Sequence, residues 1–215
     1  MKSFTKFLLI TVAIFSVSKA IQARVVTDRH DDTFRKYSKR FFGVGFDWRI
    51  FKAQGMAESN LNLNAKSFVG AQGIMQLMPT TFQEIRSKNP EIKTINHPEW
   101  NIAAGVYYDR QLWTQWREDV DQFDHNRFML SSYNAGRGTL MRAQEVARTK
   151  TLDPKLWPSI RAVAPEVPRW RHQETLGYIE RIEAFLEQMD DSGRIATRKL
   201  NCENCPDQTE SPPKE

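Results

Sequence analysis

Apolar residues recur at helical spacing along most of the chain. The clearest run, Tyr178, Ile182, Phe185 and Met189, places its members on one face of an amphipathic helix. The same spacing predicts further helices within 24–46, 47–59, 79–88, 101–117, 128–136 and 140–147. Strands of alternating polarity are scarce, and the sequence has no internal repeat. The pattern therefore predicts a mainly α fold.

Polar residues and prolines mark where several of these helices should begin and end. Asp47 is placed to cap the helix of 47–59, and Thr80 or Thr81 fits a capping box before a helix that Asn89-Pro90 stops. Asp153-Pro154 has the form of a cap followed by a proline in the first helical turn. The next stretch is expected to be irregular because of its prolines, Pro158, Pro165 and Pro168.

The first twenty residues have the features of an export signal. Lys2 and Lys6 precede the apolar run 7–15, and small residues up to Ala20 offer a cleavage site, with Ala23 as a second choice. The apolar run is short for a membrane span, which favours a cleaved signal peptide over the alternative, an uncleaved anchor. We therefore expect export to the periplasm or cell envelope.

Three segments follow this signal. Residues 21–46 form a lead segment with a short helix, and residues 47–190 carry the periodic pattern of one domain. Residues 191–215 lose that pattern, so we expect a disordered tail. Its Cys202 and Cys205 favour a local disulfide or two idle thiols in an oxidising compartment, because zinc would need two more ligands nearby.

Composition narrows the classes of function. The chain has 215 residues, of which 40% are hydrophobic and 27% charged, as in an ordinary soluble domain. Residues 1–20 carry three Lys and no acid, so their removal lowers the net charge from +5 to +2. This excess is small and its Lys and Arg are scattered, which argues against a nucleic-acid partner. Four scattered His argue against a His-built metal site.

Glu58 is the first candidate for chemistry. It lies at the end of an apolar helix, where partial removal from water would raise the pKa of its carboxyl and make it a general acid. The alternative is an ordinary solvent-facing carboxylate. Ser67 and Gln76 follow as neutral hydrogen-bonding groups, which together with apolar surface suit a glycan cleft. Gln76 could instead be a surface amide, and Met78 a contribution to the core.

Two tyrosines and an asparagine are further candidates. Tyr133 and Asn134 lie beside the glycine turn at Gly136, where the plain interpretation is an ordinary helix C-cap. Tyr178 lies on an apolar helix face, where it could equally be a core tyrosine. Position alone does not decide between these alternatives.

Several short motifs occur in an order and spacing that is specific as a set. They are Glu58-Ser59, Ser67, Gly70-Ala71, Gly73-Ile74-Met75-Gln76-Leu77-Met78-Pro79, Tyr133-Asn134-Ala135-Gly136, and Glu174-Thr175 with Tyr178. Over roughly residues 30–190 they resemble the catalytic domain of the soluble lytic transglycosylases, glycoside hydrolase family 23, which cleaves peptidoglycan with a lysozyme-like fold. The resemblance is closer still to the catalytic module of the F-type membrane-bound lytic murein transglycosylases.

The resemblance implies a mechanism with one glutamate and no metal or organic cofactor. Glu58 would protonate the glycosidic oxygen after N-acetylmuramic acid, and the substrate's N-acetyl carbonyl would stabilise the developing positive charge. Glu58 would then deprotonate the C6 hydroxyl that attacks C1, which forms a 1,6-anhydro end. No second acid occurs in the segment 59–79, which fits this scheme.

The resemblance also assigns roles around Glu58. Ser67 and Gln76 would contact the muramic sugar, and Met78 would line the cleft. Tyr133 would position the sugar or Glu58, and Asn134 would hold the shape of its loop. Tyr178 would lie on the cleft wall or have a purely structural role.

Two other functions stay open. A goose-type lysozyme has the same fold and glutamate, but it uses water as the nucleophile and leaves a reducing end. A non-catalytic peptidoglycan-binding module is disfavoured by the joint presence of Glu58, Ser67 and Gln76. The expected partner is the glycan strand of peptidoglycan, bound by a monomer, and the tail could dock on cell-wall or secretion machinery.

Overall fold

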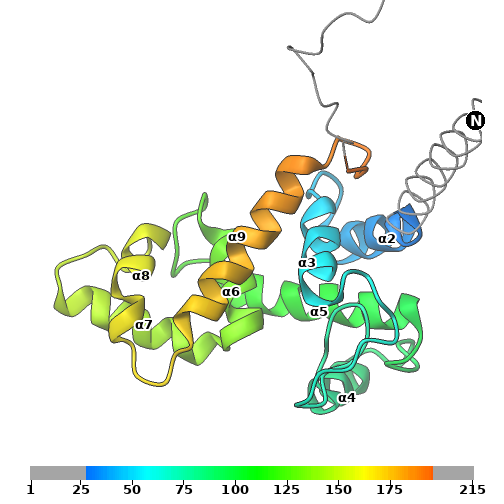
Figure 1. Ribbon diagram of the computed structural model, residues 1–215, viewed down its shortest axis with the longest axis horizontal. Coiled ribbons are helices and arrows are strands. Elements are labelled where there is room, and N and C mark those ends of the chain that lie inside the picture. The colour runs from blue at the N-terminus through cyan, green and yellow to red at the C-terminus, as the bar shows by residue number, and fades with distance from the viewer. Residues whose placement is uncertain (1–27, 196–215) are drawn as a thin grey trace, which may run out of the picture.

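The computed structural model describes residues 28–195, which are helical and joined by loops (Figure 1). This part of the chain holds eight α-helices and one 3₁₀ turn, with isolated β-bridges in place of a sheet. The elements are α2 (Asp31–Phe42), α3 (Arg49–Ser59), α4 (Pro79–Lys88), α5 (Pro98–Trp116), α6 (His125–Ala135), α7 (Arg137–Thr149), α8 (Trp157–Val163), η1 (Ala164–Glu166) and α9 (His172–Gln188). The mainly α prediction is confirmed.

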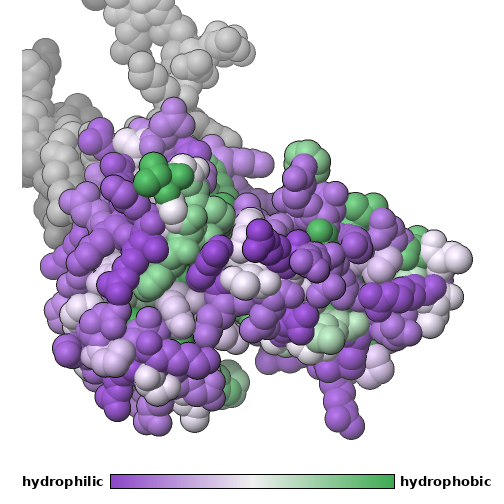
Figure 2. All heavy atoms as spheres, turned by 180° about the vertical axis from the view of Figure 1, so that it is seen from behind, coloured by the Kyte–Doolittle hydropathy of each residue, from purple (hydrophilic) through white to green (hydrophobic). Residues whose placement is uncertain are grey.

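The predicted export signal at 1–20 and the pair Cys202 and Cys205 lie outside the described residues. No helix within residues 28–195 is both long and apolar enough to cross a membrane. Seen from behind, the surface of the described part is mostly hydrophilic and is interrupted by an apolar strip (Figure 2).

Helix α5 is the centre of the packing. Its Ile102 and Val106 side chains are fully buried, and both α2 and α6 pack against it. Helix α9 packs on α3 and runs alongside it in Figure 1. This arrangement brings the end of α3, which carries Glu58, against a helix that lies more than a hundred residues later in the chain.

Prolines, rather than capping side chains, mark the starts of several helices. Helix α4 begins at Pro79 with Met78 as its N-cap, so Thr80 and Thr81 lie inside the first turn and the predicted capping box is wrong. Helix α8 begins at Trp157, not at Asp153-Pro154, so Pro158 lies in a first helical turn instead of an irregular stretch. Proline fits these positions because the first turn needs no N–H donor.

Acidic side chains accept backbone hydrogen bonds near two helix starts. Asp47 accepts one from the backbone N–H of Arg49, the first residue of α3, at 3.0 Å. The N-cap of α3 is Trp48, without a side-chain cap bond, so the predicted cap at Asp47 lies one residue too early. Asp153 accepts one from the backbone N–H of Lys155 at 2.9 Å. That bond closes a turn two residues before α8 and does not begin a helix.

The chain after α9 turns back onto the N-terminal helices. The fully buried Lys52 ammonium on α3 donates to the Gly193 carbonyl oxygen at 2.8 Å and pairs with Asp31 Oδ1 at 2.6 Å. Residues 191–195 are therefore part of the packed domain, although the sequence placed them in a disordered tail. A short polar turn has no apolar periodicity that would reveal its packing; the remainder, 196–215, lies outside the described residues.

Candidate active site

Glu58 lies one residue before the end of α3, at the edge of the core. The preceding residues of the helix, from Ile50 to Met56, are buried, whereas Glu58 itself is partly buried. The helix ends because Asn60 adopts a left-handed conformation with φ 54°. The carboxyl group is thus fixed by a rigid helix and lies next to the first residues of a loop.

Tyr178 on α9 contacts Glu58 directly. Its hydroxyl donates a hydrogen bond to Glu58 Oε1 at 2.7 Å, across the packed pair of α3 and α9. Burial raises the pKa of the Tyr178 hydroxyl far above its ordinary value, so this group stays a donor at neutral pH. Tyr178 is therefore a partner of the candidate catalytic group as well as a buried core residue.

At neutral pH the Glu58 carboxyl populates both its protonated and its ionised form. Burial raises its pKa from an ordinary 4.5 to about 7, and this effect outweighs the Tyr178 hydrogen bond and the Arg181 charge, which both lower it. A carboxyl group with such a pKa can donate a proton near pH 7 and take one back afterwards.

The loop between α3 and α4, residues 60–78, is closed by its own polar side chains. The Ser67 hydroxyl accepts a hydrogen bond from the backbone N–H of Ala71 at 3.0 Å. The Gln76 carboxamide donates to the carbonyl oxygens of Ala65 at 3.2 Å and Gly73 at 2.9 Å. Ser67 and Gln76 are both partly buried, and in this structure both shape the loop on which the resemblance places sugar contacts.

Tyr133 joins this loop to α6. Its hydroxyl donates to the Met75 carbonyl oxygen at 2.7 Å, and its ring lies 5.2 Å from that of Tyr108 on α5. Tyr133 thus fixes the loop of 60–78, which follows Glu58 in the chain, through this hydrogen bond. Met78 is 39% exposed at the start of α4, so it is a surface residue rather than part of the core.

Asn134 holds two helices together. Its Oδ1 accepts a hydrogen bond from the Thr175 hydroxyl at 2.8 Å, and that hydroxyl also accepts one from Trp170 Nε1 at 3.0 Å. This chain of bonds ties the end of α6 to the start of α9, one turn before Tyr178. A cavity of about 200 Å³ is lined by Asn134, Thr175 and several neighbouring residues, so it lies next to the hydrogen bond between these two side chains.

A buried asparagine, to which the sequence alone assigned no role, anchors the loop from behind. Asn101 on α5 accepts from the backbone N–H of Met75 at 2.8 Å and donates to the carbonyl oxygens of Gln72 at 3.1 Å and Ile95 at 3.0 Å. Gly73, with φ 79°, lies so close to the Asn101 carboxamide that a Cβ atom there would overlap it. The loop geometry therefore depends on α5.

A buried acid, Asp109 on α5, was also missed. It is fully buried, accepts a hydrogen bond from Gln54 Nε2 at 3.3 Å, and lies within electrostatic range of Glu58. Burial raises its pKa well above the ordinary value. A single Asp within an apolar helical pattern could have drawn attention to this position, but only the fold places it near Glu58.

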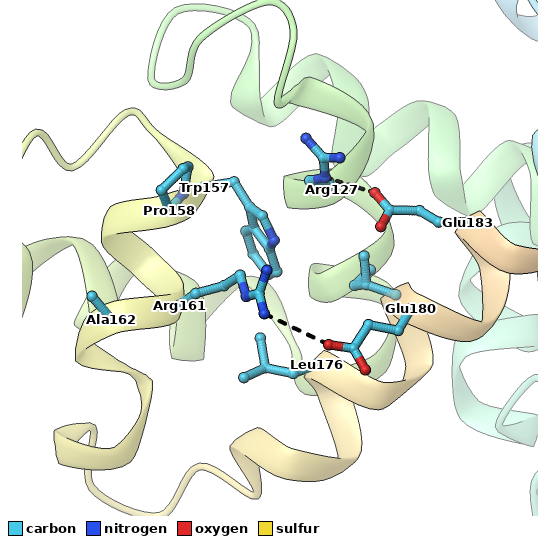
Figure 3. Close-up of a pocket in the computed structure, with 9 residues that line it drawn as sticks. Arg127, Trp157, Pro158, Arg161, Ala162, Leu176, Glu180 and Glu183 are labelled. Carbon is cyan, nitrogen blue, oxygen red and sulfur yellow. Dashed lines mark hydrogen bonds and ion pairs between the residues drawn. The ribbon is translucent and has the colours of Figure 1, made fainter.

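A cavity of about 600 Å³ between α6, α8 and α9 is separate from the candidate site (Figure 3). The α9 residues that line it lie on the face opposite Tyr178. Its charged side chains are paired, Arg127 with Glu183 at 2.7 Å and Arg161 with Glu180 at 3.7 Å. Within residues 28–195 no group of three His, Cys, Asp or Glu side chains could hold a metal ion.

The family of the chain follows from comparison with known proteins. The family model for the transglycosylase SLT domain matches residues 35–155, which is more than half of the chain. The chain therefore belongs to the SLT-domain transglycosylase family, and its helical domain has that family's lysozyme-like fold.

Individual relatives agree with this assignment. Membrane-bound lytic murein transglycosylase F of Vibrio cholerae is 30% identical over 179 residues, covering 78% of this chain and 31% of the relative. Its counterpart in Vibrio vulnificus is 31% identical over 172 residues, covering 74% and 32%. The crystal structure of the 70 kDa soluble lytic transglycosylase Slt70 from Escherichia coli matches with a TM-score of 0.53 at 26% identity, covering 78% of this chain and 26% of that one. The chain spans about a third or less of the length of these relatives.

Proposed function

We propose that this chain is a peptidoglycan lytic transglycosylase in which Glu58 is the single catalytic acid and base. It would cleave the β-1,4 bond between N-acetylmuramic acid and N-acetylglucosamine and leave a 1,6-anhydro end. The observation that carries the proposal is the partly buried Glu58 carboxyl, with a pKa of about 7 and a hydrogen bond from Tyr178, beside the loop of an SLT domain.

In the first step, protonated Glu58 donates its proton to the glycosidic oxygen. The bond between that oxygen and C1 breaks, and the N-acetylglucosamine side leaves as an alcohol. Positive charge then develops at C1, where the substrate's own N-acetyl carbonyl oxygen stabilises it. The Tyr178 hydroxyl stabilises the Glu58 carboxylate that remains, because a charged acceptor strengthens the hydrogen bond.

In the second step, the Glu58 carboxylate takes the proton of the C6 hydroxyl. O6 attacks C1, the 1,6-anhydro bond forms, and Glu58 regains the proton it gave away. No water is consumed and no second carboxylate is needed. Asp109 does not act as one, because its fully buried side chain does not reach a substrate.

The remaining site residues would bind and orient the glycan. Ser67, Gln76 and Met78 lie on or next to the loop that follows Glu58, where partly exposed groups can contact the muramic sugar. Tyr133 and Asn134 would fix the surrounding loop and helix ends through their hydrogen bonds. The export signal features at 1–20 support action in the periplasm or cell envelope, on glycan strands of peptidoglycan.

Mass spectrometry of the muropeptides released from purified sacculi tests the proposal. The wild-type protein should release 1,6-anhydro products, and Glu58→Gln should lower their release by on the order of 10²–10⁴-fold. A melting curve for Glu58→Gln close to that of the wild type serves as the control for folding.

Each alternative gives a different product. Reducing ends that contain oxygen from isotopically labelled water would identify a goose-type hydrolase. Binding of sacculi by the wild type without any release would identify a non-catalytic module. Full activity of Glu58→Gln would refute the role of Glu58.

A further inference from the structure

Two buried polar side chains lie beneath Glu58 and have no place in the mechanism above. Gln54 on α3 and Asp109 on α5 are both fully buried and are joined by one hydrogen bond, from Gln54 Nε2 to Asp109 Oδ1 at 3.3 Å. Gln54 lies four residues before Glu58 on the same helix, so the two side chains share one helix face, a turn apart. The pair is thus directly connected to the segment that carries the candidate catalytic group.

The second polar atom of each side chain has no hydrogen-bond partner in the described part of the chain. These atoms are Asp109 Oδ2 and Gln54 Oε1, and both are inaccessible to solvent. An ionised Asp109 and a carboxamide oxygen can only accept hydrogen bonds. An ionised Asp109 would therefore leave two buried acceptors unsatisfied and would add an unpaired buried charge.

One proton on Asp109 would satisfy both atoms. A protonated Oδ2 would donate to Gln54 Oε1 while Oδ1 accepts from Gln54 Nε2, which would make a two-bond ring between a carboxyl and a carboxamide. Such a neutral, fully bonded pair avoids the cost of a buried charge.

We propose that Asp109 stays protonated throughout the catalytic cycle and that its two-bond pair with Gln54 positions Glu58. The protonation state of Asp109 is a property of the folded protein and does not depend on the proposed function. The positioning role rests on the proposed function. Asp109 is a positioning residue in this proposal, because its buried carboxyl touches Gln54 and not the substrate.

The groups that face Asp109 from the packed helices agree with a neutral carboxyl. Glu58 on α3 is the ionisable acid whose charge acts on it, and the hydroxyls of Tyr133 on α6, Tyr178 on α9 and Tyr108 on α5 lie within the same electrostatic range. Burial is the main cause that raises the pKa of Asp109, and the negative charge of Glu58 raises it further. Each time Glu58 loses its proton, ionisation of Asp109 becomes less favourable.

Carbon-13 NMR of the full chain with labelled Asp carboxyls tests the protonation directly. Asp109→Asn removes one resonance and so assigns it. That resonance should have the chemical shift of a carboxylic acid and should not titrate between about pH 4.5 and pH 8, well above the ordinary pKa of Asp. A carboxylate resonance at pH 7 would overturn the proposal, whether or not the protein cleaves peptidoglycan.

Kinetics of matched variants test the positioning role. Asp109→Asn keeps a donor and an acceptor toward Gln54, so turnover and the pH profile should stay near those of the wild type. A shift of its alkaline limb to lower pH would show that a negative charge had been removed, and would contradict the proposal. Asp109→Leu leaves the Gln54 carboxamide unpaired and should lower kcat by on the order of tenfold with little change in KM.

The double variant Gln54→Leu with Asp109→Leu separates positioning from stability. It removes both polar groups and should recover melting temperature relative to Asp109→Leu, because no buried group is left unpaired. If kcat stays low after stability recovers, the pair positions Glu58. If kcat recovers along with stability, the pair is only structural and the positioning role is wrong.

Discussion

At the scale of single residues, burial and the Tyr178 hydrogen bond act in opposite directions on the protonation of Glu58. Burial raises the pKa of Glu58, and the hydrogen bond from Tyr178 lowers it. The protonated form begins the proposed reaction, so kcat/KM should be high below pH 7 and fall as the pH rises through the pKa of about 7. The limb of this profile therefore reports the environment of Glu58.

Tyr178→Phe should move that limb to higher pH. The variant removes the 2.7 Å bond that favours the carboxylate, so the pKa of Glu58 rises, by about one unit if the lost bond is worth about 1.4 kcal/mol. Pre-steady-state or kcat/KM measurements across pH give the shift. Tyr133→Phe is the matched control, because its hydroxyl bonds to the Met75 carbonyl and not to Glu58, and its limb should stay in place.

Gln76→Ala should affect both stability and turnover. A sugar contact alone, as the resemblance implies for Gln76, would predict a loss of turnover with almost no change in melting temperature. The structure shows two hydrogen bonds from its carboxamide to the loop, so their loss should cost roughly 1–3 kcal/mol and lower the melting temperature by several degrees. Thermal melts and muropeptide release measured together test this; an unchanged melting temperature would mean that these bonds contribute little.

At the scale of elements, the loop of 60–78 depends on α5 as much as on its own turns. Asn101 bonds to Met75, Gln72 and Ile95; the bond to Met75 is buried and the other two are partly buried. Because the loop follows Glu58 directly, its position relative to the Glu58 carboxyl is set by a helix that begins twenty residues after the loop ends.

Asn101→Ala should loosen this loop. Three backbone groups, one in a buried bond and two in partly buried bonds, lose their partner, at a cost of roughly 2–4 kcal/mol, and turnover should fall even at temperatures where the variant is folded. Asn64→Ala in the exposed part of the same loop is the control and should change neither quantity. Equal effects of the two variants would show that Asn101 is not the anchor.

The sequence predicted most helices because their apolar spacing is a local property. It misassigned the caps of α4 and α8, because a Thr near a proline and an Asp before a proline both match the sequence pattern of a helix cap. In the structure Pro79 begins α4 before Thr80 is reached, and Asp153 closes a turn with Lys155 instead of beginning a helix. Which hydrogen bond forms at these positions depends on how the following segment packs in the fold, and the neighbouring residues do not determine that.

For the candidate site, the motifs around Glu58 and the loop that follows it are contiguous and could be predicted. The contact between Glu58 and Tyr178 spans 120 residues and required the fold. The pair of Gln54 and Asp109 was missed because polar residues in apolar helices give no sign of which partner satisfies them. Long-range polar contacts are thus the part of the site that sequence patterns leave open.

At the scale of the whole molecule, the last residues of the described domain, 191–195, contribute to its stability. Lys52 is fully buried and depends on Asp31 from α2 and on the Gly193 carbonyl after α9. A buried ammonium group that loses an acceptor keeps its desolvation cost. The short turn of 191–195 therefore completes the charge pairing of the interior.

Two truncations separate this turn from the rest of the predicted tail. Ending the chain after Ile195 keeps every contact described above and should leave the melting temperature unchanged. Ending it after Asp190 removes the acceptor at Gly193 and should destabilise the fold by roughly 1–3 kcal/mol. Chemical denaturation of both proteins measures the difference; equal stabilities would mean that the turn does not contribute.

The closure of the domain at Lys52 also brings the two ends of the described chain together. Arg194 Nε lies 3.9 Å from Asp28 Oδ2, so a linker of about five flexible residues can join residue 195 to residue 28. New termini can then open at Phe123, which is 82% exposed between α5 and α6. Such a circular permutant cuts neither α3 nor α9, so it should fold with Glu58 against Tyr178. The order in which the helices are synthesised would then be dispensable for this fold, and the helical domain should tolerate insertion into a loop of another protein.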